Sequence, residues 1–187
     1  MLGMFYREAG AWMDALRAFE GASAAAPKSS QAHFLLGAQL ERLHQEPAAR
    51  EELRRAIELD PRHADALNYL GYMDADDGVN LKEAKTMIQR ALDVDPDNGA
   101  YLDSLGWVYF RMGDMAQALA QLQRAAELVD TDPTIFEHLG DVYFAHGDVE
   151  KARRAWHRAL ELDHHLEAIK QKLRQLPMTP LLIPAVR

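Results

Sequence analysis

The sequence predicts an all-α protein built from pairs of antiparallel helices that stack side by side, and three observations predict this class. Glycine follows leucine at five places, and these glycines recur every 34 residues with one interval of 35. An alanine, a large apolar residue and a second alanine follow each glycine at nearly constant distances. Proline closes each of the first three units. A fixed period in this range is typical of chains in which every repeat is one helix pair.

The residue types at the repeated positions have a packing reason. A glycine on the first helix and two alanines on the second let the two backbones approach closely, and the large residue fills the remaining space. One pair cannot bury its own apolar face, so neighbouring pairs must stack. The glycines are Gly3, Gly37, Gly71, Gly106 and Gly140; the large residues are Phe19, Leu53, Ile88, Leu122 and Trp156.

Capping signals set the limits of the helices in chain order. Ser29 or Ser30, Asn98 and Asp132 are expected to precede first helices over residues 30–43, 64–76, 99–112 and 133–146. Gly113 and Gly147, each followed by aspartate, are expected to separate the two helices of their pairs. Second helices are expected over residues 11–25, 46–59, 80–93, 115–128 and 149–162. The extra residue of the third unit is expected to lengthen its turn around residues 77–80.

The two ends of the chain depart from the repeat. One array is expected over residues 1–176, with units at about 1–29, 30–63, 64–98, 99–132 and 133–166. The opening helix lacks its first turn, so either a longer array precedes it or another surface covers the first pair. Residues 167–176 are expected to form a polar capping helix. The tail, residues 177–187, contains three prolines and is expected to be extended, with the apolar run 181–183 docked on a repeat surface.

Composition excludes several classes of function. The chain has 187 residues and a formal net charge of −8, which disfavours binding to nucleic acid. It has no cysteine, which excludes disulfides, thiolate metal sites and a cysteine nucleophile. No stretch is long and apolar enough to span a bilayer, so no transmembrane segment is expected. The N-terminus lacks the features of a signal peptide. The compartment stays open.

Two segments resemble metal sites, but other interpretations are favoured. Residues 93–99 resemble the start of a calcium loop, yet the sixth position is Asn98 and the twelfth is Ser104. The repeat already explains this segment as a turn between helices. His157, His164 and His165 are better explained as exposed side chains than as ligands. With no phosphate loop and no nucleophile setting, we expect no enzyme, no cofactor and no metal.

The repeated pattern resembles the tetratricopeptide repeat from Leu2 to about Leu166. The resemblance implies a right-handed α-solenoid that serves as an interaction scaffold, with the first helix of each pair lining a concave groove. Segments such as LNYLGY and HLGDVYFAHGD look like repeats of bacterial proteins, several of which are envelope lipoproteins that assemble or activate other proteins. The resemblance therefore allows a cytoplasmic location, or a periplasmic one if the chain belongs to a longer exported lipoprotein.

The resemblance also selects candidate partner-binding residues, by their offsets from each repeated glycine. The set combines aromatic and acidic side chains, which favour a protein or peptide with basic and apolar residues. Lysine, arginine and asparagine are too few in it for the clamp that grips a C-terminal carboxylate. The candidates are Asp65, Asn68, Tyr72, Asp76, Asp103, Trp107, Phe110, Arg111, Glu137, Asp141 and Phe144.

Alternative functions remain open at this point. The short first helix and the apolar tail could join copies into a homo-oligomer. A second alternative is a subunit that activates or recruits an envelope enzyme such as a peptidase. The basic residues near the C-terminus form either a solvated face or a second docking surface for an acidic protein or a membrane. They are Lys151, Arg153, Arg154, Arg158, Lys170, Lys172 and Arg174.

Overall fold

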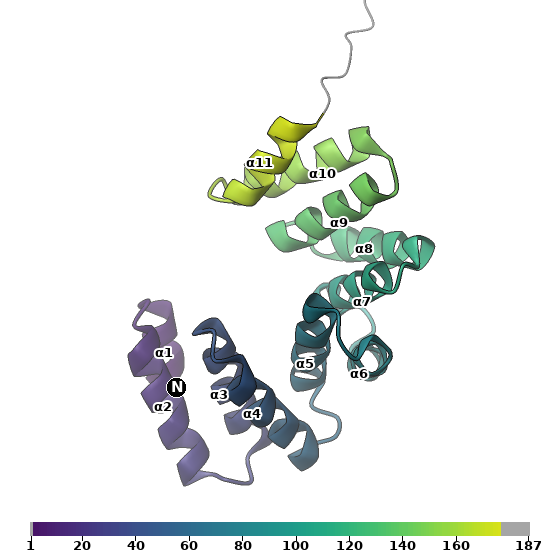
Figure 1. Ribbon diagram of the computed structural model, residues 1–187. Helices are drawn as coiled ribbons and strands as arrows, with labels where there is room; N and C mark the ends of the chain where they lie inside the picture. Colours follow the sequence, from purple (N-terminus) through teal and green to yellow (C-terminus); the bar gives the residue numbers. More distant parts are fainter. Residues whose placement is uncertain (1, 177–187) are drawn as a thin grey trace, which may run out of the picture. The chain divides into compact units, whose positions relative to one another are not determined.

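The computed structural model describes residues 2–176, which form eleven helices and no strand (Figure 1). The all-α prediction is therefore confirmed for this part of the chain. The helices are α1 (Leu2–Glu8), α2 (Trp12–Ala25), α3 (Ser30–Arg42), α4 (Glu46–Leu59), α5 (Ala64–Asp77), α6 (Leu81–Val94), α7 (Gly99–Arg111), α8 (Met115–Leu128), α9 (Pro133–Ala145), α10 (Val149–Leu162) and α11 (Glu167–Gln175).

The predicted helix limits agree with the structure to within about a residue, because the capping side chains act as expected. Ser29 accepts the amide N–H of Ala32, and Asp132 accepts that of Thr134. Gly113 and Gly147 adopt left-handed backbone conformations, with φ of 83° and 90°. One cap was not predicted: the His63 ring nitrogen Nδ1 accepts the amide N–H of Ala66 at the start of α5.

The described residues divide into two compact units between Leu128 and Val129. The first unit contains the pairs α1–α2, α3–α4, α5–α6 and α7–α8. The second unit contains the pair α9–α10 together with α11, which packs on α10 (Figure 1). A single array over residues 1–176 stays a prediction. The expected docking of residues 181–183 lies outside the described residues.

The repeated glycines lie where two helices of a pair touch. A Cβ atom added at Gly106 of α7 would stand 2.6 Å from the Leu122 Cγ atom and 3.2 Å from the Ala118 carbonyl oxygen of α8. Gly71 meets Ile88 and Ala84 in the same way. These alanines and large residues are fully buried. The predicted packing of glycine against alanine and a large side chain is confirmed in these pairs.

The extra residue of the third unit lengthens the turn between α5 and α6, as expected. Gly78 ends α5 with φ of 71°, and Asn80 precedes α6 with φ of 48°. Two left-handed residues so close together reverse the chain without breaking either helix, and asparagine tolerates that conformation better than most residues. The repeat is therefore extended at its turn and intact in its helix pair.

A repeated arginine, not used in the sequence analysis, ties neighbouring pairs together. Arg90, Arg124 and Arg158 occupy the same place in the second helices of successive units. Each donates to a carbonyl oxygen in the turn before its own pair, at Pro61, Pro96 and Asp130 respectively. Turn carbonyls left open at a helix end need such donors. The 34-residue spacing of these arginines was a signal that could have been read from the sequence.

Candidate functional site

Eight of the predicted partner-binding residues lie on two neighbouring first helices, α5 and α7, which we call the α5–α7 face. Its members are Asp65, Asn68, Tyr72, Asp76, Asp103, Trp107, Phe110 and Arg111. Tyr101 of α7 donates its hydroxyl to Asp65 Oδ1, near the start of both helices, with 2.5 Å between the oxygens. Near their ends, Arg111 donates to the carbonyl oxygen of Asp76 and lies 4.0 Å from its carboxylate. The two helices are thus connected at both ends.

The side chains of the α5–α7 face differ in how much of them a partner could touch. Asp65 and Asp76 are exposed, whereas Tyr72, Trp107 and Phe110 are partly buried. The rings of Trp107 and Phe110 lie 5.1 Å apart, and Trp107 also packs on the core of α5, α6 and α7. Asp103 is only 6% exposed and therefore offers the least surface. The accessible part of this face combines carboxylates with aromatic rings.

Burial and a carboxylate neighbour change the acid–base chemistry of two tyrosines beside this face. Desolvation raises the pKa of Tyr101, and the hydrogen bond to Asp65 raises it further. Desolvation likewise raises the pKa of Tyr69, whose hydroxyl donates to Glu41 Oε2 at 2.9 Å. Both phenols therefore stay protonated and act as donors to acidic residues.

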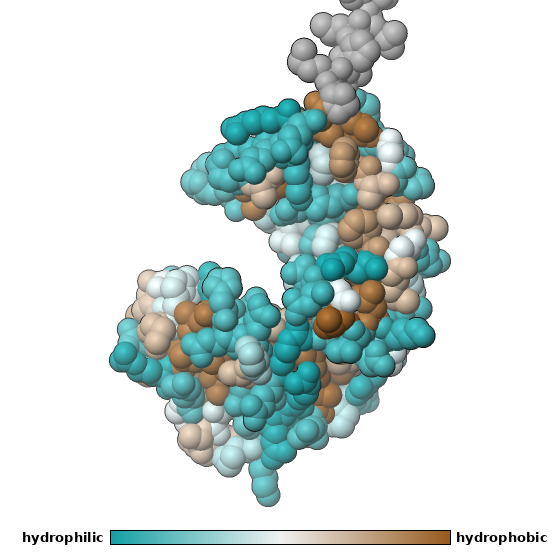
Figure 2. Space-filling model, viewed as in Figure 1, coloured by the Kyte–Doolittle hydropathy of each residue, from teal (hydrophilic) through white to brown (hydrophobic). Residues whose placement is uncertain are grey.

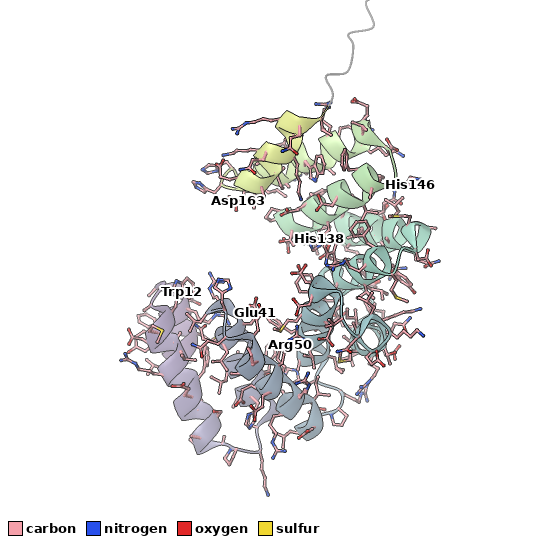
Figure 3. The ribbon with its side chains drawn as sticks, in the orientation of Figure 1. Trp12, Glu41, Arg50, His138, His146 and Asp163 are labelled. Carbon is pink, nitrogen blue, oxygen red and sulfur yellow. The ribbon has the colours of Figure 1, made fainter. Side chains whose placement is uncertain are left out.

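The helix before this face, α3, carries contacts that the selected set did not contain. Glu41 joins α3 to α5 through Tyr69, whose ring meets that of Phe34 edge-on at 6.1 Å. The guanidinium of Arg42 lies 3.9 Å from the ring centroid of Trp12. Figure 3 shows Glu41 on α3 and Trp12 at the start of α2. The acidic and aromatic character of the α5–α7 face therefore continues along the first helices onto α3.

An ion-pair network joins α4 to α5 and was not predicted. Arg50 lies between these helices (Figure 3) and pairs with both Asp74 and Asp77. It also donates to the carbonyl oxygen of Met73 at 3.2 Å. Asp74 is buried, so Arg50 compensates a carboxylate that would otherwise be costly to desolvate. Arg50 and Asp74 are 24 positions apart, so no local pattern in the sequence announces the pair.

The remaining three candidates, Glu137, Asp141 and Phe144, lie on α9 in the second unit. Phe144 is exposed. The two carboxylates already have a cationic partner, because the ammonium of Lys172 on α11 lies 2.7 and 2.8 Å from the oxygens of Asp141 and 3.2 Å from Glu137 Oε1. The Trp156 indole also donates to Asp141, at 3.0 Å. The sequence analysis placed Lys172 in a basic surface and missed this role.

Most of the other basic residues near the C-terminus form short-range pairs on their own helices. Lys151 pairs with Asp148, and this bond raises the pKa of Lys151 and lowers that of Asp148. Lys170 pairs with Glu167 and lowers the pKa of that carboxyl. Arg158 pairs with Glu161. Exposed pairs of this kind contribute little to stability.

The two segments that resemble metal sites have structural roles or no cluster. Asn98 caps α7 by accepting the amide N–H groups of Ala100 and Tyr101, and Asp95 ends α6. His164 and His165 stack on each other, with ring centroids 4.0 Å apart. Within residues 2–176, no three histidine or acidic side chains come together in a way that could hold a metal ion. None of the helices there is long and apolar enough to cross a membrane.

The chain is a member of the tetratricopeptide-repeat superfamily. Family models described as tetratricopeptide or TPR repeats match residues 1–43, 40–78, 106–147 and 133–166. The TPR repeat-containing protein PA4667 of Pseudomonas aeruginosa is 43% identical over 68 residues, which is 36% of this chain. The aligned part spans 12% of the length of that bacterial relative. The predicted family is confirmed.

Solved structures agree on the α-solenoid fold. A thermophilic TPR protein of Thermus thermophilus superposes with a TM-score of 0.77 at 23% identity, over 92% of this chain and 94% of its own. PilF of Pseudomonas aeruginosa gives 0.70 at 24% identity, over 86% and 73%. PilW, a type IV pilus biogenesis factor, gives 0.79 at 21% identity, over 92% and 79%. At these identities the likeness shows the fold alone. This fold is generally an interaction scaffold.

Proposed function

We propose that this chain is a non-catalytic scaffold that binds a peptide or partner protein on the first helices of its repeats. The observation that carries the proposal is the gathering of exposed carboxylates and partly exposed aromatic rings on the α5–α7 face. Aromatic side chains offer large contact area at a low entropic cost, and carboxylates favour lysine and arginine in a ligand. A ligand with basic and apolar residues fits this chemistry.

The family supports the proposal at the level of class. Tetratricopeptide repeats present their first helices as a binding surface, and the family matches of this chain are to interaction repeats. The printed title of PilW connects that protein to pilus biogenesis, which is an assembly process. Recruitment or activation of an envelope enzyme stays a more specific prediction for this chain.

Affinity capture from the native cell extract tests the scaffold proposal. The double variant Trp107→Ala plus Phe110→Ala should lose a partner that the wild type recovers, because central aromatic contacts are worth about 2 kcal/mol or more each. Val94→Ala plus Leu128→Ala is the matched control, since both side chains are exposed apolar groups outside this face. Because Trp107 also packs on the core, circular dichroism must first show that the variant is folded.

Charge provides a second, gentler test of the same face. Asp65→Asn plus Asp76→Asn keeps the size and the hydrogen-bond acceptors but removes two negative charges. We expect slower association with the captured partner and a weaker dependence of the rate on salt. Equal recovery of every partner by the wild type, the aromatic variant and the charge variant would contradict the assignment of this face.

Self-assembly is the second candidate function, because one observation favours it. Four large apolar side chains of the first pair are exposed: Leu2 at 61%, Met4 at 43%, Phe5 at 63% and Met13 at 53%. Clustered exposed apolar groups mark interaction surfaces more often than isolated ones do. Sedimentation at several concentrations tests this candidate: association that Phe5→Ser plus Met13→Ser abolishes supports it, and a monomer at all concentrations excludes it.

A further inference from the structure

The fifth repeat differs from the others in the chemistry of its first helix. The two positions that lie three residues before and one residue after the repeated glycine are Asn68 and Tyr72 in α5, and Asp103 and Trp107 in α7. In α9 they are Glu137 and Asp141, so both are carboxylates. Two neighbouring carboxylates repel each other unless a cation lies between them. This pair is therefore suited to hold one positive group.

Lys172 of α11 supplies that group in the structure. Its ammonium reaches three carboxylate oxygens of Glu137 and Asp141 at 2.7 to 3.2 Å. It also lies 5.8 Å from the ring centroid of Trp156, whose indole N–H orients Asp141. Residues from α9 and α10 thus form a small receptor for one lysine. The side chains of Lys172, Glu137 and Asp141 remain 33%, 26% and 21% exposed, so water and a competing cation can reach them.

The helix that carries this lysine presents it together with apolar anchors. Ile169, which is fully buried, and Leu176, which is 7% exposed, lie on the same side of α11 as Lys172, because they are three and four positions away. The opposite side of α11 is hydrophilic (Figure 2). The bound segment therefore has the pattern apolar, two residues, lysine, three residues, apolar.

Little else holds α11 in place. It has nine residues, no side-chain N-cap, and Ile169 as its only buried residue, whereas α9 buries six. Elements with few buried contacts open at lower free energy than the rest of a protein. The lysine latch, defined as Lys172 with Glu137 and Asp141, is thus a large part of what fastens this helix.

We propose that α11 is an internal ligand of the fifth repeat, and that a lysine-bearing amphipathic helix of a partner protein takes its place. The partner segment would repeat the spacing of Ile169, Lys172 and Leu176. This inference rests on the proposed function, because it assigns the α9 carboxylates to partner binding. It adds that this surface is closed by the chain itself, and that binding requires α11 to leave.

The full chain with a synthetic peptide of residues 163–176 tests the proposal. Lys172→Ala should weaken the internal contact and raise the population of open chains, so the peptide should bind at least about tenfold more tightly than it binds the wild type. Lys170→Ala is the matched control, because Lys170 is two residues away and pairs only with Glu167 of its own helix. It should bind the peptide as weakly as the wild type does.

A second variant separates opening of α11 from recognition of lysine. Glu137→Gln plus Asp141→Asn should also free α11, which hydrogen exchange of that helix would report, but it should not gain peptide binding. A peptide in which the lysine equivalent to Lys172 is alanine should bind none of the proteins. Equal peptide affinity of the Lys172→Ala protein and the wild type, or unchanged exchange in α11, would overturn the proposal.

The outcome is independent of the scaffold test. The peptide experiment uses only α9, α10 and α11, while Trp107 and Phe110 lie in α7. Loss of a partner by the aromatic variant together with no peptide binding by Lys172→Ala would retain the scaffold and reject the internal ligand. The reverse pattern would retain the internal ligand and reject the α5–α7 face.

Discussion

Single atoms decide how closely the two helices of a repeat approach. Gly106 has no Cβ, and one added there would stand 2.6 Å from Leu122 and 3.2 Å from a backbone oxygen that cannot move independently. The same substitution has opposite signs at different glycines of this chain. Gly21 also lies in a helix, but nothing would lie within 4 Å of its Cβ.

Gly106→Ala should therefore destabilise the protein, while Gly21→Ala should stabilise it. Overpacking costs about 1–3 kcal/mol, which exceeds the roughly 1 kcal/mol that alanine gains over glycine inside a helix. At Gly21 only the gain in helix propensity remains, about 0.5–1 kcal/mol. Urea unfolding of the two variants measures both. A Gly106→Ala protein as stable as the Gly21→Ala protein would show that the helix pair can separate without cost.

The hydrogen bond from Tyr101 to Asp65 makes stability depend on alkaline pH. Because the pKa of Tyr101 is raised in the folded protein, the unfolded chain loses its phenolic proton first as the pH rises above about 10. The contribution of Tyr101 is thus complete below that pH and is lost above it. We expect the free energy of unfolding to fall more steeply above that pH in the wild type than in Tyr101→Phe. Urea unfolding over a pH series tests this, and identical slopes would reject it.

Between elements, a buried ion pair has a stronger effect than the exposed pairs. Arg50 joins α4 to α5 through Asp74, whose side chain is 6% exposed, whereas Arg55 on the same helix pairs with exposed Glu58. Removing one partner leaves a buried, uncompensated charge in the first case only.

Arg50→Met should cost about 3–5 kcal/mol, and Arg55→Met should stay within about 0.5 kcal/mol. Adding Asp74→Asn to Arg50→Met should recover part of the loss, because the stranded carboxylate is then neutral. Thermal unfolding of the four proteins measures these differences. A small loss on Arg50→Met would mean that water reaches Asp74 despite its burial.

At the scale of the whole molecule, repeats contact only their neighbours, so stability should fall toward the ends of the described chain. Helix α7 buries eight residues, whereas α1 buries only Gly3 and α11 only Ile169. Hydrogen exchange should therefore be fastest in α1 and α11 and slowest in α7 within the first unit. Uniform protection from α1 to α8 would indicate that the first unit opens as one cooperative body.

The helices were predictable because their determinants lie close together in the chain. Gly106, Ala118 and Leu122 belong to one pair, and caps such as Asn98 and Asp132 act within three residues. A period of 34 residues repeats these local rules, so each unit supports the interpretation of the next. His63 was missed as a cap because its role depends on which ring nitrogen faces the amide group.

The selected surface residues were only partly interpretable, because their environment is set by distant positions. Asp103 has the same offset from its glycine as Asn68 and Glu137, yet it is buried. Lys172 lies 31 positions from Asp141, and nothing in the spacing of either residue pairs them. Packing of α11 on α10 brings the ammonium to the carboxylates. Local sequence therefore determined the helices and the family, and only tertiary packing decided which carboxylates already have a cation, because charges pair in space.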